Sequence, residues 1–479
     1  MTIPASDHIS RIAGKLAEKQ SLLSLAGLEG SAPAYLLSRL IGQGCAPLLI
    51  VTADQESADE LCRELRFFCA EPEAVFSFPC WDLTPFEATS PHPDLVGERL
   101  NALLRLLDGR ARAVVLPLPA ALQRVIPRRT LGEVCQYLVT GEELERENLI
   151  EKLVKLGYAH VPVVEDRGSF SVRGGILDIF PPDQAKPVRI EFFGDLVETM
   201  RLFDPVSQRS LEPLSELVLL PSREVILSDQ VLKEFTPRLK RRCDHLGIGA
   251  DRRRELLEQL QHAIYPPGID FLQPLFHPDL ETILDYAGPE AIRVLLDPDA
   301  LSEAGERFTE ELSAAVVRAE LRDAVTCEPA ELFLSEAELQ LAFSGGPRLL
   351  LPRLEIAGEG GELIRLQTAA NTDLKLEVSA EGDRVLAPLT EKIVSWIAGG
   401  FRVLIPCHQA GQGRRLYELL SHYRLPLEIS QERFAGAAGR PAGRVEILTG
   451  DISRGFRLEA ERLIVIAEEE IFGKRVKRR

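Results

Sequence analysis

Residues 168–210 read GSFSVRGGILDIFPPDQAKPVRIEFFGDLVETMRLFDPVSQRS. Apolar and polar residues alternate through SFSVRGGILDIF, VRIEFFGD and ETMRLFD, and turn-forming residues separate the three runs. A period of two places the apolar side chains of a strand on one face. The stretch therefore predicts a three-stranded antiparallel meander with one buried face. Gly174 and Gly175 interrupt the first strand, where they predict a bulge or a close approach of another backbone.

Three side chains of the meander suggest a docking surface. Arg173 and Arg189 lie on runs that we expect to pair with each other. Because Phe192 and Phe193 are adjacent, one of them must point away from the core. An exposed aromatic side chain beside two arginines is typical of a protein interface. The simpler interpretation is a surface salt bridge for each arginine and a core position for Phe193.

The segment before the meander has the pattern of a parallel sheet. From residue 21 onward the chain predicts a strand, a glycine-bearing turn, a helix, the strand PLLIV and a second helix, which is a βαβ alternation. A phosphate-binding loop would read GxxxxGK followed by Ser or Thr, since the lysine offsets phosphate charge and the hydroxyl holds magnesium. Residues 27–34 read GLEGSAPA. The loop keeps glycines but has lost its chemical groups: the positions concerned are Gly27, Gly30, Ala32, Pro33 and Ala34.

A second position agrees with this loss of nucleotide chemistry. The strand RVLLDPDAL ends in Asp297, where an ATPase would carry a magnesium-binding Asp followed by a Glu that activates water. Pro298 follows instead and can do neither. For the loop itself, a sufficient explanation is that Ser31 caps a helix that Pro33 helps to start.

Composition limits the classes of protein that remain. The 479 residues are 45% hydrophobic and 27% charged, which fits a globular chain of roughly three domains. The chain has no apolar run of about 18 residues, and its first 25 residues are too polar for a signal peptide, so we expect a cytoplasmic protein without a membrane partner. Eight scattered cysteines without a CxxC pair predict buried, reduced thiols rather than a metal site.

The charge of the chain argues against a large nucleic-acid interface. The formal net charge is −17, whereas nonspecific affinity for DNA grows with the number of Lys and Arg that displace counterions. Basic clusters at residues 240–242, 252–254 and 474–479 are mixed with acidic residues or lie at the end of the sequence. We interpret them as solvated helix faces or a tail.

Three segments together resemble a known family. WDLTPFEATSPHPDLVGERL, the meander up to QRSL, and EEEIFGKRVKRR resemble, in content, order and spacing, the N-terminal part of bacterial transcription-repair coupling factors. The first two segments are also similar to UvrB, a nucleotide-excision-repair protein. The resemblance implies that the inserted domain recruits UvrA, and the positions that match the family's contact residues are Arg173, Arg189 and Phe193.

The resemblance also implies what this segment lacks. Its basic end falls just before the place where the family has an RNA-polymerase-interacting domain and a translocase motor. ATP, magnesium, RNA polymerase and DNA are therefore expected to belong to that later part, and no cofactor is expected for this segment. UvrB-like proteins have an intact phosphate loop and an aromatic DNA-gripping hairpin, whereas this chain has only scattered aromatic residues in 76–86, so we do not expect it to clamp DNA.

Patterns and resemblance together predict an α/β architecture. A degenerate RecA-like, P-loop-type parallel-sheet domain is split by an inserted α+β antiparallel domain and followed by a small α/β domain. The expected boundaries are 1–126 and 210–335 for the split domain, 127–209 for the UvrA-binding insertion, 336–346 for a linker, 347–470 for the small α/β domain and 471–479 for a linker to the missing part.

Two functions from different classes follow. The first is a non-catalytic adaptor that binds UvrA within a protein that releases stalled RNA polymerase and recruits excision repair. The alternative is a UvrB-like, ATP-dependent enzyme that processes DNA damage, against which Pro33, Ala34 and Pro298 argue. A small-molecule α/β enzyme would need convergent polar groups at strand ends, and the sequence offers no such cluster.

Overall fold

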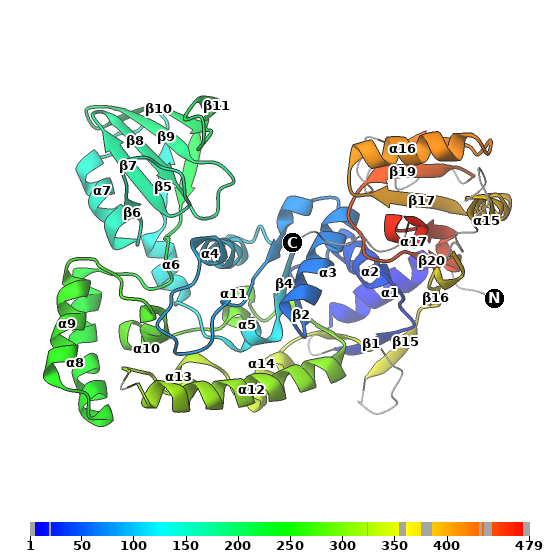
Figure 1. The fold of residues 1–479 in the computed structure, drawn as a ribbon. Helices are drawn as coiled ribbons and strands as arrows, with labels where there is room; N and C mark the ends of the chain where they lie inside the picture. The colour runs from blue at the N-terminus through cyan, green and yellow to red at the C-terminus, as the bar shows by residue number, and fades with distance from the viewer. Residues whose placement is uncertain are drawn as a thin grey trace.

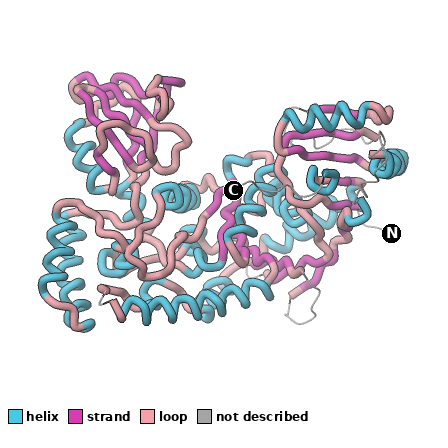
Figure 2. Tube along the Cα trace, viewed as in Figure 1, coloured by secondary structure: helices cyan, strands magenta, loops and turns pink. Residues whose placement is uncertain are grey.

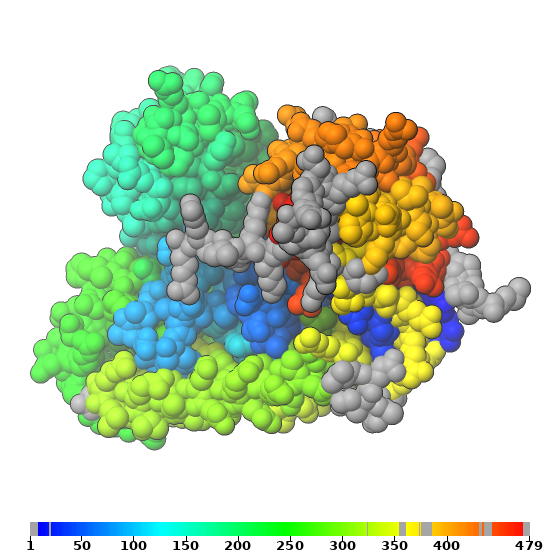
Figure 3. Space-filling view, turned by 45° about the vertical axis from the view of Figure 1, so that its right-hand side comes forward, coloured from blue at the N-terminus to red at the C-terminus, as the bar shows by residue number. Residues whose placement is uncertain are grey.

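The computed structural model describes residues 5–18, 21–322, 324–353, 361–374, 386–430, 434 and 443–472. These residues form three units, each built on one main sheet (Figure 1). We call them, after those sheets, the parallel unit, the antiparallel unit and the mixed unit. The parallel unit lies in the middle, and the other two stand on it as separate bulges in the space-filling view (Figure 3).

The parallel unit is built on a seven-stranded sheet in which every neighbouring pair is parallel. In sheet order the strands are β15 (Glu362–Arg365), β1 (Leu22–Ala26), β14 (Arg348–Leu351), β13 (Ile292–Leu296), β2 (Leu48–Thr52), β4 (Ala113–Pro117) and β3 (Val75–Ser77). All residues of β2 and β4 are buried. Continuous apolar strands of this kind need helices on both faces of the sheet.

Helices cover both faces of this sheet. On one face, buried residues of three helices form a core with the sheet: α1 (Ala5–Leu16), α2 (Ala32–Gly42) and α3 (Gln55–Phe68). The opposite face packs against α4 (Pro93–Leu107), α5 (Leu118–Leu122), α6 (Arg128–Val134), α11 (Ile283–Ala287), α12 (Pro298–Glu320) and α14 (Glu336–Ser344). The coarse prediction of an α/β fold is therefore confirmed.

The strands of this sheet come from two separate parts of the chain. Strands β1 to β4 lie before residue 118 and strands β13 to β15 after residue 291. The predicted domain boundary in the second of these parts was wrong. Residues 347–365 were expected in the small α/β domain, but β14 and β15 pair with β1, and most of the expected linker 336–346 is helix α14. The run LLL of β14 is buried, which suits a central parallel strand.

The antiparallel unit contains more strands than the meander predicted. Its six-stranded sheet follows the order β11 (Ser210–Leu214), β10 (Leu196–Phe203), β9 (Val188–Phe193), β8 (Ile176–Phe180), β7 (Ser169–Arg173) and β6 (Ala159–His160). Helix α7 (Arg146–Lys155) packs on its inner face and lies beside the sheet in Figure 2, and β5 (Gln136–Val139) pairs with β12 (Glu216–Leu219). The unit therefore continues ten residues beyond the expected end at residue 209.

The glycine pair forms a turn rather than the predicted bulge, but the predicted close approach of another backbone is confirmed, because a Cβ at Gly175 would lie 2.9 Å from the carbonyl oxygen of Phe192. Gly174 and Gly175 form the two-residue connection between β7 and β8, with Arg173 opposite Ile176. Gly174 has φ 60°, in the left-handed region that tight hairpin turns require. The run SFSVRGGILDIF is thus a hairpin rather than one interrupted strand.

A helical segment connects the antiparallel unit back to β13. It contains α8 (Asp229–Leu246), α9 (Ala250–Gln261), the 3-10 helix η2 (Ile269–Leu272) and α10 (Gln273–Phe276), and α13 (Pro329–Leu332) packs on it later in the chain. Helices α8 and α9 form a hairpin at one end of the molecule (Figure 1). This segment has its own apolar core with the loop around Trp81.

The mixed unit has a six-stranded sheet of parallel and antiparallel pairs. Its order is β16 (Thr368–Ala369), β20 (Phe456–Leu458), β21 (Leu463–Val465), β17 (Arg402–Cys407), β19 (Val445–Thr449) and β18 (Leu427–Ile429). Helices α15 (Ala387–Ala398) and α16 (Ala410–Ser421) pack on it, and α17 (Glu468–Phe472) follows β21. Residues 473–479, part of the expected linker and basic tail, lie outside the described residues.

Candidate protein interface and the altered phosphate loop

Alternation along β9 sorts its side chains between the two faces of the antiparallel sheet. Val188, Ile190 and Phe192 are buried, whereas Arg189 and Glu191 are half-buried and Phe193 is exposed. Strand pairing extends these outer positions into rows across the sheet. One row holds Asp178, Arg189 and Arg201, the next holds Arg173, Ile176, Glu191 and Thr199, and the last pairs Phe193 with Leu196. The three predicted contact residues therefore share the outer face, in three successive rows.

Phe193 is the most exposed aromatic side chain of this surface. It is 76% exposed, while its neighbour Phe192 is 8% exposed. The prediction that one of the two phenylalanines points away from the core is confirmed. When a partner covers an exposed aromatic ring, a large apolar area leaves water, so such a ring can contribute strongly to the free energy of binding.

Arg189 is held within the unit. Its guanidinium donates from Nε to Asp178 Oδ1 at 2.7 Å and from a terminal nitrogen to Asp178 Oδ2 at 2.9 Å. It also lies over the ring of Phe203, with 4.8 Å between its Cζ and the ring centroid. The hydrogen bonds to Asp178 raise the pKa of Arg189, so the pair is a fixed charge pair rather than a free arginine. Sequence reasoning missed Asp178, although an acidic residue inside ILDIF was the available signal.

Arg173 differs from Arg189 in exposure and position. Its side chain is exposed and donates to the carbonyl of Pro162 at 3.0 Å. The two runs that carry the arginines pair as expected, but through β8, the second half of the first run, so Arg173 on β7 does not lie next to β9. Arg146 also reaches this end of the sheet, where it donates to the carbonyl of Gly174 at 2.5 Å, and no pattern in the sequence indicated it.

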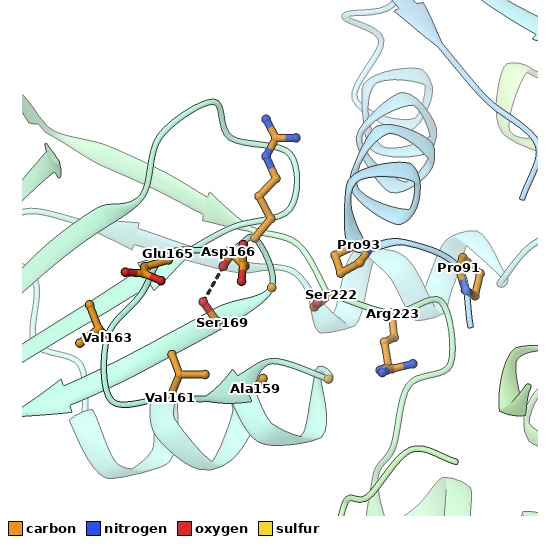
Figure 4. A pocket seen from close by; sticks show the side chains of 13 residues that line it. Pro91, Pro93, Ala159, Val161, Val163, Glu165, Asp166, Ser169, Ser222 and Arg223 are labelled. Carbon is orange, nitrogen blue, oxygen red and sulfur yellow. Dashed lines mark hydrogen bonds between the residues drawn. The ribbon is translucent and has the colours of Figure 1, made fainter. Parts of the chain in front are cut away.

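A cleft separates the antiparallel unit from the parallel unit (Figure 4). Its volume is about 420 Å³, and Glu165 and Asp166 lie across it from Arg223. The other lining residues are Pro91, Pro93, Gly157, Ala159, Val161, Val163, Arg167, Gly168, Ser169 and Ser222. These described lining residues include no histidine or cysteine.

The altered phosphate loop lies between β1 and α2. Gly27 and Gly30 have φ 82° and 56°, and Ala32, Pro33 and Ala34 form the first turn of α2. Ser31 stands at the capping position, as predicted, but its side chain makes no capping bond, and its buried hydroxyl oxygen has no hydrogen-bond partner. The prediction that Ser31 caps α2 is therefore wrong for its side chain, because its φ and ψ of −83° and 10° depart from the extended geometry of a capping residue.

Asp297 is found where the sequence placed it, at the end of a strand. Asp297 follows β13 and precedes α12, with φ 53° and no side-chain capping bond. No group of three potential metal ligands occurs among the described residues. Within the same part of the chain no helix is long and apolar enough to cross a bilayer. All eight cysteines are free thiols, six of them buried and Cys80 and Cys135 half-buried.

The basic clusters of α8 and α9 are paired with acidic side chains. Arg242 contacts Glu328 at 2.9 Å and also Glu331, and Arg253 contacts Asp244 at 3.4 Å. The interpretation as solvated helix faces holds for Arg252 and Arg254, whose side chains are exposed, but not for Arg242, whose side chain is only 12% exposed. The third cluster, 474–479, lies outside the described residues.

Comparison with known proteins identifies relatives over nearly the whole chain. The family described as "UvrB interaction domain" matches residues 137–224, which contain the antiparallel sheet. The transcription-repair-coupling factor of Myxococcus xanthus is 33% identical over 95% of this chain, and that of Mycobacterium bovis is 30% identical over 99%. The protein of the same name from Escherichia coli is 28% identical over 95%.

The chain spans about two fifths of the length of these relatives, since the matches cover 39%, 39% and 38% of them. The resemblance to bacterial transcription-repair coupling factors that the three sequence segments indicated is confirmed by these matches.

Proposed function

We propose that this chain, similar along its length to transcription-repair-coupling factors, is a non-catalytic adaptor whose antiparallel unit binds UvrA. The match of the interaction-domain family to this unit supports the assignment. The observation that carries it is Phe193, 76% exposed on the outer face that also presents Arg173. In a whole protein of this kind, acting in the bacterial cytoplasm, RNA polymerase and DNA would be the further partners.

The proposed contact surface combines an aromatic anchor with charged side chains. Phe193 would supply desolvated apolar area, and the fork of Arg173 would bind a carboxylate or a main-chain carbonyl of UvrA. Arg189 would contribute through the edge that Asp178 leaves open, since 18% of its side chain is exposed. Glu191 lies in the same row as Arg173 and would favour a basic group on the partner.

We also propose that the parallel unit is a RecA-like scaffold that has lost nucleotide chemistry and uses no cofactor. Pro33 and Ala34 at the first turn of α2 support this, because neither can supply the lysine or hydroxyl that a phosphate loop needs. The alternative, a UvrB-like ATP-dependent enzyme, would require this chain to hydrolyse ATP.

A titration of UvrA with substituted chains tests the adaptor proposal. Phe193→Ala and Arg173→Ala are each expected to weaken binding by about 1 kcal/mol or more, the size expected of an interface anchor. Val206→Ala is the matched control, since Val206 is an apolar residue of the same unit that is 91% exposed and lies in the turn between β10 and β11. It should bind like the unsubstituted chain.

Arg189 needs a different substitution. Arg189→Ala or Arg189→Glu would leave the nearly buried Asp178 without its partner and disturb the sheet itself. Arg189→Lys keeps the charge but removes the forked geometry, so a loss of affinity with intact folding would indicate a direct contact. Unchanged affinity for all three folded variants would refute the assignment.

A further inference from the structure

The altered phosphate loop is occupied by main chain from the mixed unit. The amide of Ser31 donates to the carbonyl of Arg454 at 3.0 Å, and the amide of Glu29 donates to Thr368 Oγ1 at 2.7 Å. Amides at this position, before the first turn of a helix, are the groups that hold phosphate in nucleotide-binding loops. We infer that the loop now serves as a receptor for the mixed unit and joins it to the parallel unit as one cooperative block.

Gly30 permits this close approach, and Gly27 permits the approach of a different main-chain segment, which directly follows β15 of the parallel unit. A Cβ atom at Gly30 would collide with the carbonyl oxygen of Gly455, and one at Gly27 would lie 2.5 Å from the carbonyl oxygen of Leu366. Glycine at both positions therefore has a reason that does not involve a nucleotide, because each lets a second main chain reach the loop. The space that a phosphate would need next to Ser31 is filled by protein.

Polar contacts on α2 and α3 continue the same junction. Glu64 accepts hydrogen bonds from the amide of Ser453 at 2.9 Å and from its hydroxyl at 2.7 Å. The hydroxyl of Tyr35 donates to Glu461. These partners lie about 390 and 426 positions apart in the sequence, so each bond joins the beginning of the chain to its end.

Apolar packing makes the junction continuous. The core on the α1 to α3 face of the parallel sheet contains residues of the mixed unit as well. Those residues are Leu404, Phe434, Leu448, Ile452, Phe456, Leu458, Leu463, Val465 and Ala467. The ring of Tyr35 lies 5.9 Å from that of Phe434 and 5.6 Å from that of Phe456, between centroids. A shared core of this kind predicts that the two units open together.

Native-state hydrogen exchange on the full chain tests this inference. In the unsubstituted chain, the slowest amides of β2 and β17 should exchange with the same opening free energy. Gly30→Ala should speed exchange in β17 and β19 by about tenfold or more, while β9 and β10 of the antiparallel unit remain unchanged. The matched control is Gly44→Ala, at φ 87° just beyond the other end of α2, where a Cβ meets no atom within 4 Å.

Equal exchange of β17 in the Gly30→Ala and Gly44→Ala variants would overturn the inference. If Gly30→Ala does not fold, Glu64→Ala provides the second test, since it removes the acceptor of both Ser453 bonds while leaving the loop unchanged. It should also speed exchange in β17 and β19, and no change there would contradict the junction.

Hydrogen exchange in the presence of nucleotide completes the experiment. Adding ATP with magnesium to the unsubstituted chain should leave exchange in the loop and in β17 unchanged, because the loop amides already have protein partners. Protection of residues 27–35 by ATP would overturn the inference. This inference does not rest on UvrA binding, so the two proposals can fail separately. Absence of UvrA binding would not change the expected exchange pattern, and an unexpected exchange pattern would not change the expected UvrA binding.

Discussion

The mixed unit and the antiparallel unit are both attached to the parallel unit, but by opposite means. The mixed unit shares an apolar core with it, and main-chain carbonyls enter the loop before α2. The antiparallel unit keeps a separate core of its own, and a cleft of about 420 Å³ lies between it and its host. The mixed unit and the parallel unit therefore form a single block, whereas the antiparallel unit has its own core and is set apart from the parallel unit by the cleft.

Point contacts hold the antiparallel unit in place. Arg167 bridges to Asp94 on α4 at 3.1 Å, and Pro182 packs against Gly97, where a Cβ would collide with its carbonyl. These contacts involve one end of the unit and leave the outer face around Phe193 uncovered by the described part of the chain. The comparison teaches that the inserted unit is built to present a surface, and the mixed unit to complete a scaffold.

The largest expected effect concerns a buried ion pair between α4 and the segment that returns from the antiparallel unit. Arg99 on α4 and Glu224, on the segment returning from the antiparallel unit, are both fully buried, with 2.5 Å between Arg99 Nε and Glu224 Oε1. Trp81 Nε1 also donates to Glu224 at 2.9 Å. Arg99→Ala would leave Glu224 as an unpaired buried charge, so we expect a loss of about 3–5 kcal/mol in the free energy of unfolding, measured with urea.

Arg129→Ala is the control for that measurement. Arg129 pairs with Glu133 at 2.7 Å, but its side chain is 87% exposed, so its removal should leave the free energy of unfolding nearly unchanged. If the two variants lose similar stability, the buried pair does not hold the return segment as described.

The next effect concerns the junction with the mixed unit. Burial raises the pKa of Glu64 to about 7, against an ordinary value of 4.5, so the folded chain retains a proton that the unfolded chain releases. A raised pKa gives stability that is complete below about pH 4.5 and is lost as pH rises through about 7. The contribution at stake is on the order of 3 kcal/mol. Glu64→Gln has no proton to lose at this position, so it should remove this pH dependence. Comparing the free energy of unfolding of the unsubstituted chain with that of Glu64→Gln from pH 5 to 8 measures the effect.

Neighbouring charges modify this expectation without reversing it. Glu60 on the same helix raises the pKa of Glu64, and Arg63 lowers it. From the mixed unit, Asp451 pairs with Arg63 at 3.3 Å and lies 3.1 Å from the imidazole of His408. Because His408→Ala leaves both Ser453 bonds intact, it should keep the pH dependence attributed to Glu64. Profiles of equal slope for the unsubstituted chain and Glu64→Gln would contradict the assignment.

The smallest effect is expected at the N-termini of two helices, α2 and α3, that pack on the parallel sheet. The side chain of Asp54 accepts from the amide of Ser57 at 2.8 Å at the start of α3, whereas Ser31 makes no such bond at the start of α2. Asp54→Ala should cost about 1 kcal/mol, and Ser31→Ala should be nearly neutral, because the Ser31 hydroxyl makes no hydrogen bond that the substitution could remove. A cost at Ser31 equal to that at Asp54 would show that its hydroxyl contributes to the junction.

Sequence patterns predicted local structure better than long-range pairing. Alternation correctly separated Phe192 from Phe193, and the changed residues at Pro33 and Ala34 correctly drew attention to the loop before α2. The pairing of Arg189 with Asp178 follows from strand order. The glycine pair that sets this order was interpreted as a bulge or a close approach of another backbone, and its role as a turn was not foreseen. Periodicity gives the face of a residue but not its neighbour on the next strand.

The occupied loop could not have been predicted at all from local pattern. Arg454 lies more than 400 residues from Ser31, and its carbonyl, not its side chain, makes the contact. Main-chain groups are the same in every residue, so no choice of amino acid records which carbonyl fills the loop. The only sequence signal of this contact is Gly30, because a side chain there would collide with Gly455. This signal is ambiguous, since glycine also fits an ordinary phosphate loop.

The position of β1 has a consequence for synthesis on the ribosome. Its two sheet neighbours, β14 and β15, are made more than 300 residues later. At ordinary rates of translation, Leu22–Ala26 must wait on the order of tens of seconds without a pairing partner. The antiparallel unit, whose strands β7 to β11 pair in succession, can meanwhile fold as it emerges. The nascent chain thus completes the outer face around Phe193 before the parallel sheet closes, and until then β1 has an unpaired strand edge.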